Sequence, residues 1–373
     1  MLSNVNALLI AWAVSLIIVV GGVLTLEASY EPAPATEAVA EALTTASNTP
    51  APNDTTSYTD TPVEQPLDQL NETDALSSDE VRGLPAPGEQ VTPARRLPIQ
   101  RLNREIPAVA LPELLEQSPQ GLLPKISEDG RKPYDVYAAS APITDIPARI
   151  ALMVTDLGLK SRITQNAVAE LPSDIGLAFS PYSRDLNNWG ERARRDGHEV
   201  FLSIPMEPVN YPQNDPGSLT LLTSHSQRES TNILKQSLGR MTGYVGILNH
   251  MGSRFTAASD SLRPILDEVN RRGLMFVDSR TTPYSRAATM ARAIGLPVAL
   301  NNGYIDSDLS SELIAEELKK LEQRAQTQGA AMGMARPYPV SISAIKVWVA
   351  TLEERGFVLV PVTSIANRQA IPR

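Results

Sequence analysis

The sequence predicts an α/β fold for residues 148–367, arranged as a distorted (β/α) barrel of seven or eight strands. Eight short apolar runs recur there between helical patterns, and this repetition within one domain is typical of such a barrel. The runs lack polar–apolar alternation, as expected for strands that are buried on both faces. They are Ile150–Val154, Ile175–Phe179, Val200–Ile204, Tyr244–Leu248, Leu274–Val277, Pro297–Leu300, Ala330–Met334 and Phe357–Val360. A doubly wound open sheet is the alternative fold.

Amphipathic helices are predicted between these strands. Apolar residues recur at helical spacing from Leu262 to Val269 and again from Leu313 to Ala325. Ser226 and Glu229 form a capping box, which favours a helix start at that point. Glycines just before the next strand indicate four helix ends. They are Gly197, Gly273, Gly329 and Gly356.

The N-terminal part of the chain has a different composition. Residues 5–26 are almost wholly apolar, and about 20 such residues span a bilayer as a helix. Residues 1–27 are therefore predicted to form a transmembrane helix or an uncleaved signal anchor, with the C-terminal domain exported. The alternative is a cleaved signal peptide, which typically begins with basic residues that are missing here.

Residues 28–147 are rich in proline, alanine, threonine and glutamate. They are predicted to be a disordered linker, because they carry too little apolar surface to offset chain entropy. Near Leu111–Gln117 a short docked helix is one interpretation, and a semi-extended linker that leans on the domain is the other. The formal charge of −9 belongs mainly to the segment before Arg82, which has no lysine or arginine. No basic stripe is evident, so no nucleic-acid partner is expected.

Polar side chains follow the predicted strands, at the end of the barrel where catalytic and binding residues lie in this fold. They include Thr155, Asp156, Ser180, Ser203, Glu207, Asn249, His250, Asp278, Arg280, Asn301, Asn302, Arg336 and Thr363. No glycine-rich phosphate loop, Gly-x-Ser-x-Gly elbow or His-Glu-x-x-His pair accompanies them. The chain has no cysteine, which excludes thiolate chemistry. Among its histidines, His198 and His225 are predicted to be structural or solvated, whereas His250 directly follows an apolar run and is the functional candidate.

Six ordered motifs between about Ala148 and Val362 resemble the divergent polysaccharide deacetylases, a bacterial envelope family related to the NodB-type carbohydrate esterases. The motifs are VTDLG (154–158), GHEVFLSIPMEP (197–208), YPQNDPG (211–217), TGYVGILNHMGSRFT (242–256), FVDSRT (276–281) and ARPYP (335–339). The resemblance implies a barrel of the glycoside hydrolase or deacetylase type and metal-dependent removal of acetyl groups from sugars. It also implies a bacterial inner-membrane protein with a periplasmic domain and cell-envelope glycan as its partner.

The resemblance further implies a metal site. In the superfamily a divalent ion, most often zinc, is held by an aspartate and two histidines and activates a water molecule. On this sequence the metal residues would be Asp156, Glu207 and His250, and the catalytic residues would be His250 and Asp278. A site without metal is the alternative.

Three positions depart from the family pattern. Thr155 stands where the base is expected, Ser203 where a metal-binding histidine is expected, and Arg336 where the late histidine is expected. Loss of the base alone costs on the order of a hundredfold to ten-thousandfold in rate, so weakened or absent deacetylation is predicted. Several residues nearby are expected to bind substrate, in particular its acidic groups. They are Ser253, Arg254, Arg280 and Arg336.

Three functions remain open on the sequence alone. The first is a membrane-tethered, metal-dependent carbohydrate deacetylase of the envelope. The second is a non-catalytic domain that binds glycan or a protein partner in envelope assembly. The third is a glycoside hydrolase, which needs two carboxylates about 5 to 10 Å apart. The relative positions of Asp156, Glu207, His250 and Asp278 discriminate among them.

Overall fold

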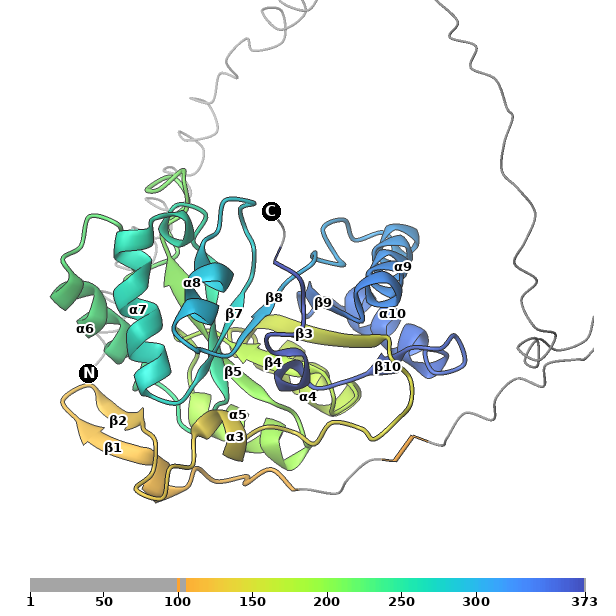
Figure 1. Cartoon of the computed structure of the whole chain (residues 1–373), viewed down its shortest axis with the longest axis horizontal. Coiled ribbons are helices and arrows are strands. Elements are labelled where there is room, and N and C mark those ends of the chain that lie inside the picture. Colours follow the sequence, from red (N-terminus) through yellow and green to blue (C-terminus); the bar gives the residue numbers. More distant parts are fainter. Residues whose placement is uncertain (1–98, 101–104, 372–373) are drawn as a thin grey trace, which may run out of the picture. The chain divides into compact units, whose positions relative to one another are not determined.

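The structure, a computed structural model, describes residues 99–100 and 105–371. Its centre is a nearly closed barrel of seven parallel strands (Figure 1). In sheet order they are β3 (Arg149–Leu157), β4 (Gly176–Phe179), β5 (Val200–Met206), β6 (Gly246–Met251), β7 (Met275–Asp278) and β8 (Val298–Leu300), with β9 (Ala330–Ala335) on the other side of β3. Every apolar run that was predicted to be a strand overlaps an observed strand, so the predicted α/β barrel is confirmed.

The eighth predicted strand, β10 (Val358–Leu359), does not complete the ring. It pairs only with Arg149 and Ile150, at the start of β3. β4 pairs further along β3, from Met153 onward, whereas β9 follows β3 from Arg149 to Val154. The barrel therefore has seven strands, and β10 is a short addition at the end remote from the strands' C-termini.

The ladder is interrupted between β8 and β9. Backbone hydrogen bonds from the turn at 302–305 reach β9, and the C-terminal segment covers the rest of the β8 edge (Figure 1). Asn367 donates its backbone N–H to Val298 O at 2.8 Å and accepts from Val298 N at 3.2 Å through its side chain. The Gln369 amide accepts from Leu300 N at 2.7 Å and donates to Leu300 O at 2.6 Å. Side chains thus replace the missing strand pairing.

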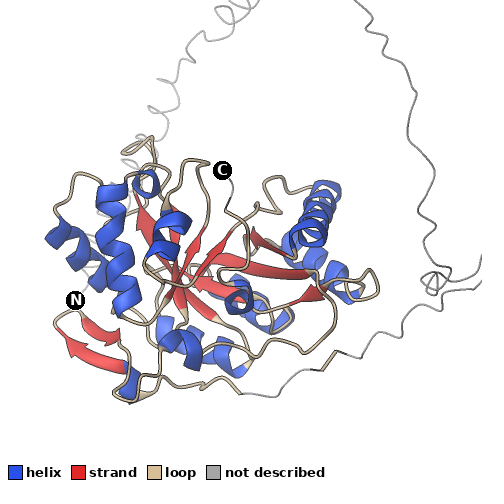
Figure 2. Ribbon diagram, viewed as in Figure 1, coloured by secondary structure: helices blue, strands red, loops and turns tan. Residues whose placement is uncertain are grey.

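Helices cover the outside of the barrel (Figure 2). In the described residues they are α4 (Ser161–Glu170), α5 (Leu186–Arg195), α6 (Gln227–Leu238), α7 (Ser259–Arg271), α8 (Ala287–Ala293), α9 (Ser311–Gln328) and α10 (Pro339–Ala350). The Ser226 hydroxyl accepts a hydrogen bond from Glu229 N at 3.3 Å, which confirms the predicted cap of α6. Gly329 ends α9 at φ 79°, in the left-handed region that favours glycine.

The core has two apolar layers. One joins alternate strand residues such as Leu152 and Val154 to the inner faces of the helices. The other gathers residues from the opposite face of the strands, including Met153, Phe201 and Val277, into the barrel interior. Strands that are buried on both faces explain why the sequence shows unbroken apolar runs.

The linker prediction is wrong for residues 105–147. They form η2 (Pro112–Leu114), the antiparallel hairpin of β1 (Leu115–Ser118) and β2 (Gly121–Pro124), and α3 (Pro133–Val136). The helix considered near 111–117 is a single 3-10 turn followed by β1. Leu114 and Tyr137 are buried with the interior layer of the barrel. We call residues 105–147 the arm.

Two buried arginines hold the arm against the barrel. Arg194 of α5 donates to the carbonyl of Ala108 at 2.6 and 3.0 Å. Arg272, at the end of α7, donates to the Pro124 carbonyl at 2.8 Å and forms an ion pair with Glu116 at 2.9 Å. Charged groups this deeply buried require such partners. Contacts of this kind leave no hydrophobic periodicity in the sequence, which is why composition alone indicated disorder.

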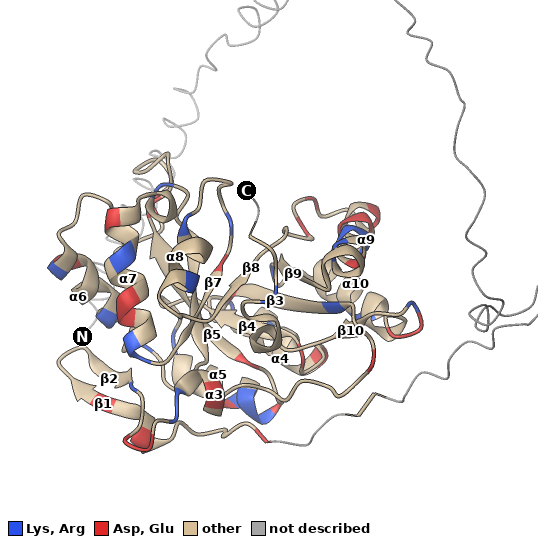
Figure 3. Ribbon diagram, viewed as in Figure 1, with Lys and Arg blue, Asp and Glu red and all other residues tan. Residues whose placement is uncertain are grey.

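Basic and acidic residues are interspersed along the outer helices (Figure 3). Arg263 pairs with Asp267 at 2.9 Å on α7, and Lys320 pairs with Glu317 at 2.6 Å on α9. Within residues 99–100 and 105–371, no helix is both long enough and apolar enough to cross a membrane. The predicted membrane segment at 5–26 and the linker before residue 99 lie outside the described residues.

Candidate functional site

The C-terminal ends of the parallel strands form the mouth of the barrel, where barrels of this class carry their sites. Three non-glycine residues there adopt the left-handed conformation: Asp156 on β3 (φ 59°), Met251 on β6 (φ 56°) and Arg280 after β7 (φ 50°). This conformation costs on the order of 1–3 kcal/mol per residue and is concentrated at functional sites. Backbone strain therefore marks the mouth independently of any motif.

Asp156 and His250 meet across the mouth. They come from β3 and β6, which β4 and β5 separate in the sheet. His250 Nδ1 lies 3.4 Å from Asp156 Oδ1, and about a third of each side chain is exposed. Burial raises the pKa of Asp156, but the hydrogen bond and charge of His250, together with the charge of Arg336, outweigh it and hold the pKa below its usual 3.8. The structure thus brings the side chains of these two predicted site residues into contact.

Glu207 connects two loops at the mouth of the barrel. Its carboxylate accepts from the backbone N and the hydroxyl of Thr223 at 2.6 and 2.7 Å and pairs with Arg254 at 3.1 Å. Burial raises its pKa, but the bonds from Thr223 and Arg254 hold the pKa below its usual value. Nearby, the Ser253 hydroxyl accepts from Val209 N at 3.0 Å. Glu207, Ser253 and Arg254 therefore tie together the loops that follow β5 and β6.

Asp278 anchors the loop after β7. It is 1% exposed and accepts hydrogen bonds from Arg280 N at 2.9 Å and from the Ser285 hydroxyl at 2.8 Å. Burial raises its pKa above the usual value despite these bonds. The carboxylate holds the strained backbone of Arg280 in place and is closed to solvent.

The residues that replace expected catalytic groups lie in the wall of the barrel. Thr155 is buried, and its hydroxyl donates to Ala335 O at 3.4 Å. Ser203 is also buried, and its hydroxyl has no hydrogen-bond partner within the described part of the chain. Neither side chain supplies the ionisable group that the family pattern places there.

Arg336 belongs to a cluster that the sequence only partly revealed. Its backbone N donates to Asp306 Oδ2 at 2.6 Å, and its guanidinium Nη1 lies 3.8 Å from Asp306 Oδ1. The guanidinium carbon lies 5.2 Å from the centre of the Tyr304 ring. Burial, followed by the charge of Asp156, raises the pKa of Tyr304 to about 12. Tyr304 and Asp306 were missed, although the signal was a polar run, NNGYIDSD, directly after an apolar strand.

These pairings decide whether the residues could hold a metal. Among the described residues, no three His, Asp or Glu side chains are grouped as metal ligands. Asp156 and His250 supply two donors, whereas a protein zinc site takes about three. The oxygens of Glu207 and Asp278 are already occupied by hydrogen bonds from their own loops. The residues at the mouth therefore do not fit the expected ligand set for a divalent ion.

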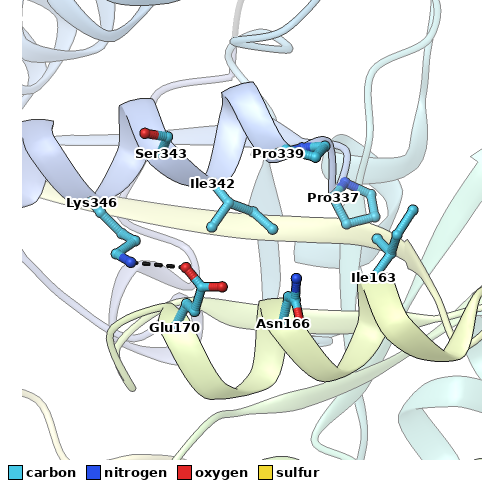
Figure 4. Close-up of a pocket in the computed structure, with 8 residues that line it drawn as sticks. All are labelled: Ile163, Asn166, Glu170, Pro337, Pro339, Ile342, Ser343 and Lys346. Atoms are coloured by element: carbon cyan, nitrogen blue, oxygen red, sulfur yellow. Dashed lines mark hydrogen bonds and ion pairs between the residues drawn. The ribbon is translucent and has the colours of Figure 1, made fainter.

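A small cavity opens beside Asp156, and we call it the mouth cavity. It encloses about 160 Å³ and is lined by Asp156, Leu159, Lys160, Ile163, Thr164, Arg336, Pro337 and Tyr338. A second cavity of about 140 Å³ lies between α4 and α10 (Figure 4). The two share Ile163 and Pro337, and the ion pair of Lys346 with Glu170 at 2.9 Å lies in the wall of the second. Both are apolar clefts with charged residues at their edges.

The nearly closed parallel barrel of seven strands matches a barrel of the deacetylase type. The chain belongs to the divergent polysaccharide deacetylase family, whose model matches residues 152–366. This confirms the resemblance carried by the motifs.

Three proteins similar to the chain are themselves uncharacterized. The uncharacterized protein YibQ of Escherichia coli K12 is 25% identical over 236 residues, which cover 63% of this chain and 72% of that protein. An uncharacterized protein of Haemophilus influenzae is 24% identical over 215 residues, covering 56% and 73%. The crystal structure of the uncharacterized protein ATU2773 from Agrobacterium tumefaciens C58 is 33% identical, with a TM-score of 0.63 over 66% of this chain and 99% of that chain.

Proposed function

We propose that this domain binds cell-envelope carbohydrate at the mouth of the barrel, and that metal-dependent deacetylation is weakened or lost in this chain. The observation that carries the proposal is the pairing of the acidic residues. Asp156 is paired with His250, while Glu207 is held by Thr223 and Arg254. Family membership supports a carbohydrate ligand, and the pairing argues against a complete set of metal ligands.

The mouth offers the groups that recognise a sugar. Asp156 and His250 are partly exposed and present hydrogen-bonding atoms to hydroxyl and acetamido groups. Leu159 and Tyr338, which are 57% and 38% exposed, line the cavity beside them. An apolar wall with a few fixed polar groups is the usual composition of a small-molecule site.

The competing function is metal-dependent deacetylation, which the family assignment favours. It requires a third metal ligand from a rearranged loop.

The cellular location is part of our proposal: the apolar segment at 5–26 would anchor the protein in a bacterial inner membrane with the barrel in the periplasm. The alternative role, docking a protein partner in envelope assembly, would leave glycan affinity undetectable.

The test uses the purified full-length protein. Binding to N-acetylglucosamine oligosaccharides is measured by calorimetry, zinc content by elemental analysis, and acetate release by an enzyme-coupled assay. We expect binding without stoichiometric zinc and without acetate release. Asp156→Asn should weaken binding about tenfold, which corresponds to about 1.4 kcal/mol.

Asp267→Asn is the matched control, because Asp267 is an exposed aspartate on α7. It should bind as the wild type does. Stoichiometric zinc together with acetate release that Asp156→Asn abolishes would establish the deacetylase instead. Absence of binding to every glycan tested would overturn the carbohydrate role.

A further inference from the structure

The guanidinium of Arg336 lies beside Asp306 and Tyr304 at the end of β9. Asp306 is fully buried; its Oδ2 accepts a hydrogen bond from the backbone N of Arg336, and its Oδ1, which has no hydrogen-bond partner among the described residues, lies 3.8 Å from the guanidinium. The Ser341 hydroxyl donates to the same carboxylate at 2.9 Å, and Tyr304 lies under the guanidinium. The side chain nevertheless remains 40% exposed. Arg336 is therefore a pre-positioned cation with free N–H groups.

The exposed part of Arg336 lines the mouth cavity together with Lys160. Within residues 99–100 and 105–371, no ion pair engages Lys160, whose side chain is exposed. The other charge of the cavity, Asp156, is paired with His250. Lys160 and Arg336 thus border one small cavity, and the Asp156 carboxylate that also lines it contacts His250.

We propose that the mouth cavity is a subsite for a carboxylate, and that it selects an acidic sugar among envelope glycans. This inference rests on the proposed carbohydrate function and names its substrate class. Arginine presents a planar pair of donors that matches the two oxygens of a carboxylate, while lysine adds a point charge. Leu159, Ile163 and Tyr338 provide the apolar wall for the carbon atoms that carry the acid.

The volume of the mouth cavity suits one substituent of a sugar and not a whole small molecule. Pockets that enclose whole small molecules measure about 300–1,000 Å³, whereas the mouth cavity measures about 160 Å³. It therefore accepts the acidic side group of one sugar, while neighbouring sugars lie over Asp156 and His250. A lactyl ether or a uronic acid carboxylate has this form.

Two probes of equal length isolate the carboxylate. One is an oligosaccharide of N-acetylglucosamine alone, and the other alternates N-acetylglucosamine with N-acetylmuramic acid. Calorimetry with the full-length wild type should show at least tenfold tighter binding of the acidic probe, and the preference should fall as salt is added. Lys160→Gln and Arg336→Gln should each reduce the preference to near unity.

The controls separate charge from folding. Arg336→Gln leaves Asp306 buried without its cation, so its thermal unfolding is compared with the wild type. Lys160 is exposed, and Lys160→Gln tests the inference without that concern. Lys319→Gln, an exposed change on α9, should keep the full preference.

The outcomes distinguish this inference from the proposed function. A preference for the acidic probe that survives both Lys160→Gln and Arg336→Gln overturns the subsite. Equal binding of the two probes by the wild type also overturns it and leaves the carbohydrate role intact. Failure of the wild type to bind either probe overturns the carbohydrate role itself.

Discussion

Replacement of Glu199 by glutamine should remove much of the pH dependence of the barrel's stability. Glu199 precedes β5, is fully buried, and joins the arm to η4 (Val362–Ile365). Its carboxylate accepts from the backbone N of Ala139 and of Thr363, each at 3.1 Å, and from the Thr363 hydroxyl. Burial raises the pKa of Glu199 from 4.5 to about 7, although these hydrogen bonds oppose the shift.

The sign follows from the raised pKa. The fold prefers the protonated carboxyl, so the contribution of Glu199 to stability is fully present below pH 4.5 and is lost as the pH rises through 7. Each unit of difference between the folded and unfolded pKa is worth about 1.4 kcal/mol. The free energy of unfolding should therefore fall by about 3 kcal/mol between pH 4.5 and 8 on account of this residue. Glu199→Gln is neutral throughout and avoids that loss.

Urea unfolding of the full-length wild type and Glu199→Gln, followed by tryptophan fluorescence from pH 4.5 to 8, measures the effect. The difference between the two proteins cancels every other titrating group. It should shift by about 3 kcal/mol in favour of the variant across this range. Glu316→Gln, an exposed change on α9, should run parallel to the wild type. A wild-type-to-variant difference that stays constant with pH refutes the reasoning.

Three further predictions follow from contacts described above. Glu207→Ala should lower the free energy of unfolding by about 2 kcal/mol, because it leaves Thr223 and Arg254 without their acceptor; an unchanged denaturant midpoint would contradict its anchoring role. Arg194→Met should accelerate amide hydrogen exchange at least tenfold in residues 105–124 and leave β3 to β6 protected, whereas uniform acceleration would argue against a local clamp. Added zinc should leave Tm within about 1 °C, because Asp156 and His250 alone bind weakly. A site saturated at a hundred times its Kd would instead add about 2.7 kcal/mol of stability.

The barrel was predictable because its strands are buried on both faces. Runs such as Ile150–Val154 must be apolar at every position, and this signal needs no knowledge of distant contacts. The arm was not predictable in the same way. Arg194 and Arg272 bind it mainly through backbone carbonyls, which any sequence supplies, and Arg272 also pairs with the Glu116 carboxylate. The strand count was predicted only as seven or eight, because composition does not show that β9 pairs with β3 and that β10 contacts only its start.

The site was predictable in its position and less so in its pairings. The sequence placed Asp156 and His250 at the ends of strands, and the structure brings their side chains within 3.4 Å of each other. The hydrogen bond between Glu207 and Thr223 could not be predicted, because Thr223 lies in a loop whose position is set by the folded structure. Asp306 was missed because its role appears only when the turn after β8 meets the end of β9. Carboxylates at the mouth therefore differ in role according to the loop residues that contact them.

The side-chain closure between β8 and β9 has a consequence for solution behaviour. Asn367 and Gln369 cover an otherwise open strand edge, and an unpaired edge is a template for pairing with another chain. Proteolysis or truncation before Asn367 would leave most of the core intact and expose β8. The principal hazard for a chain shortened in this way is therefore edge-to-edge self-association, which would appear as concentration-dependent aggregation of a protein that still looks folded.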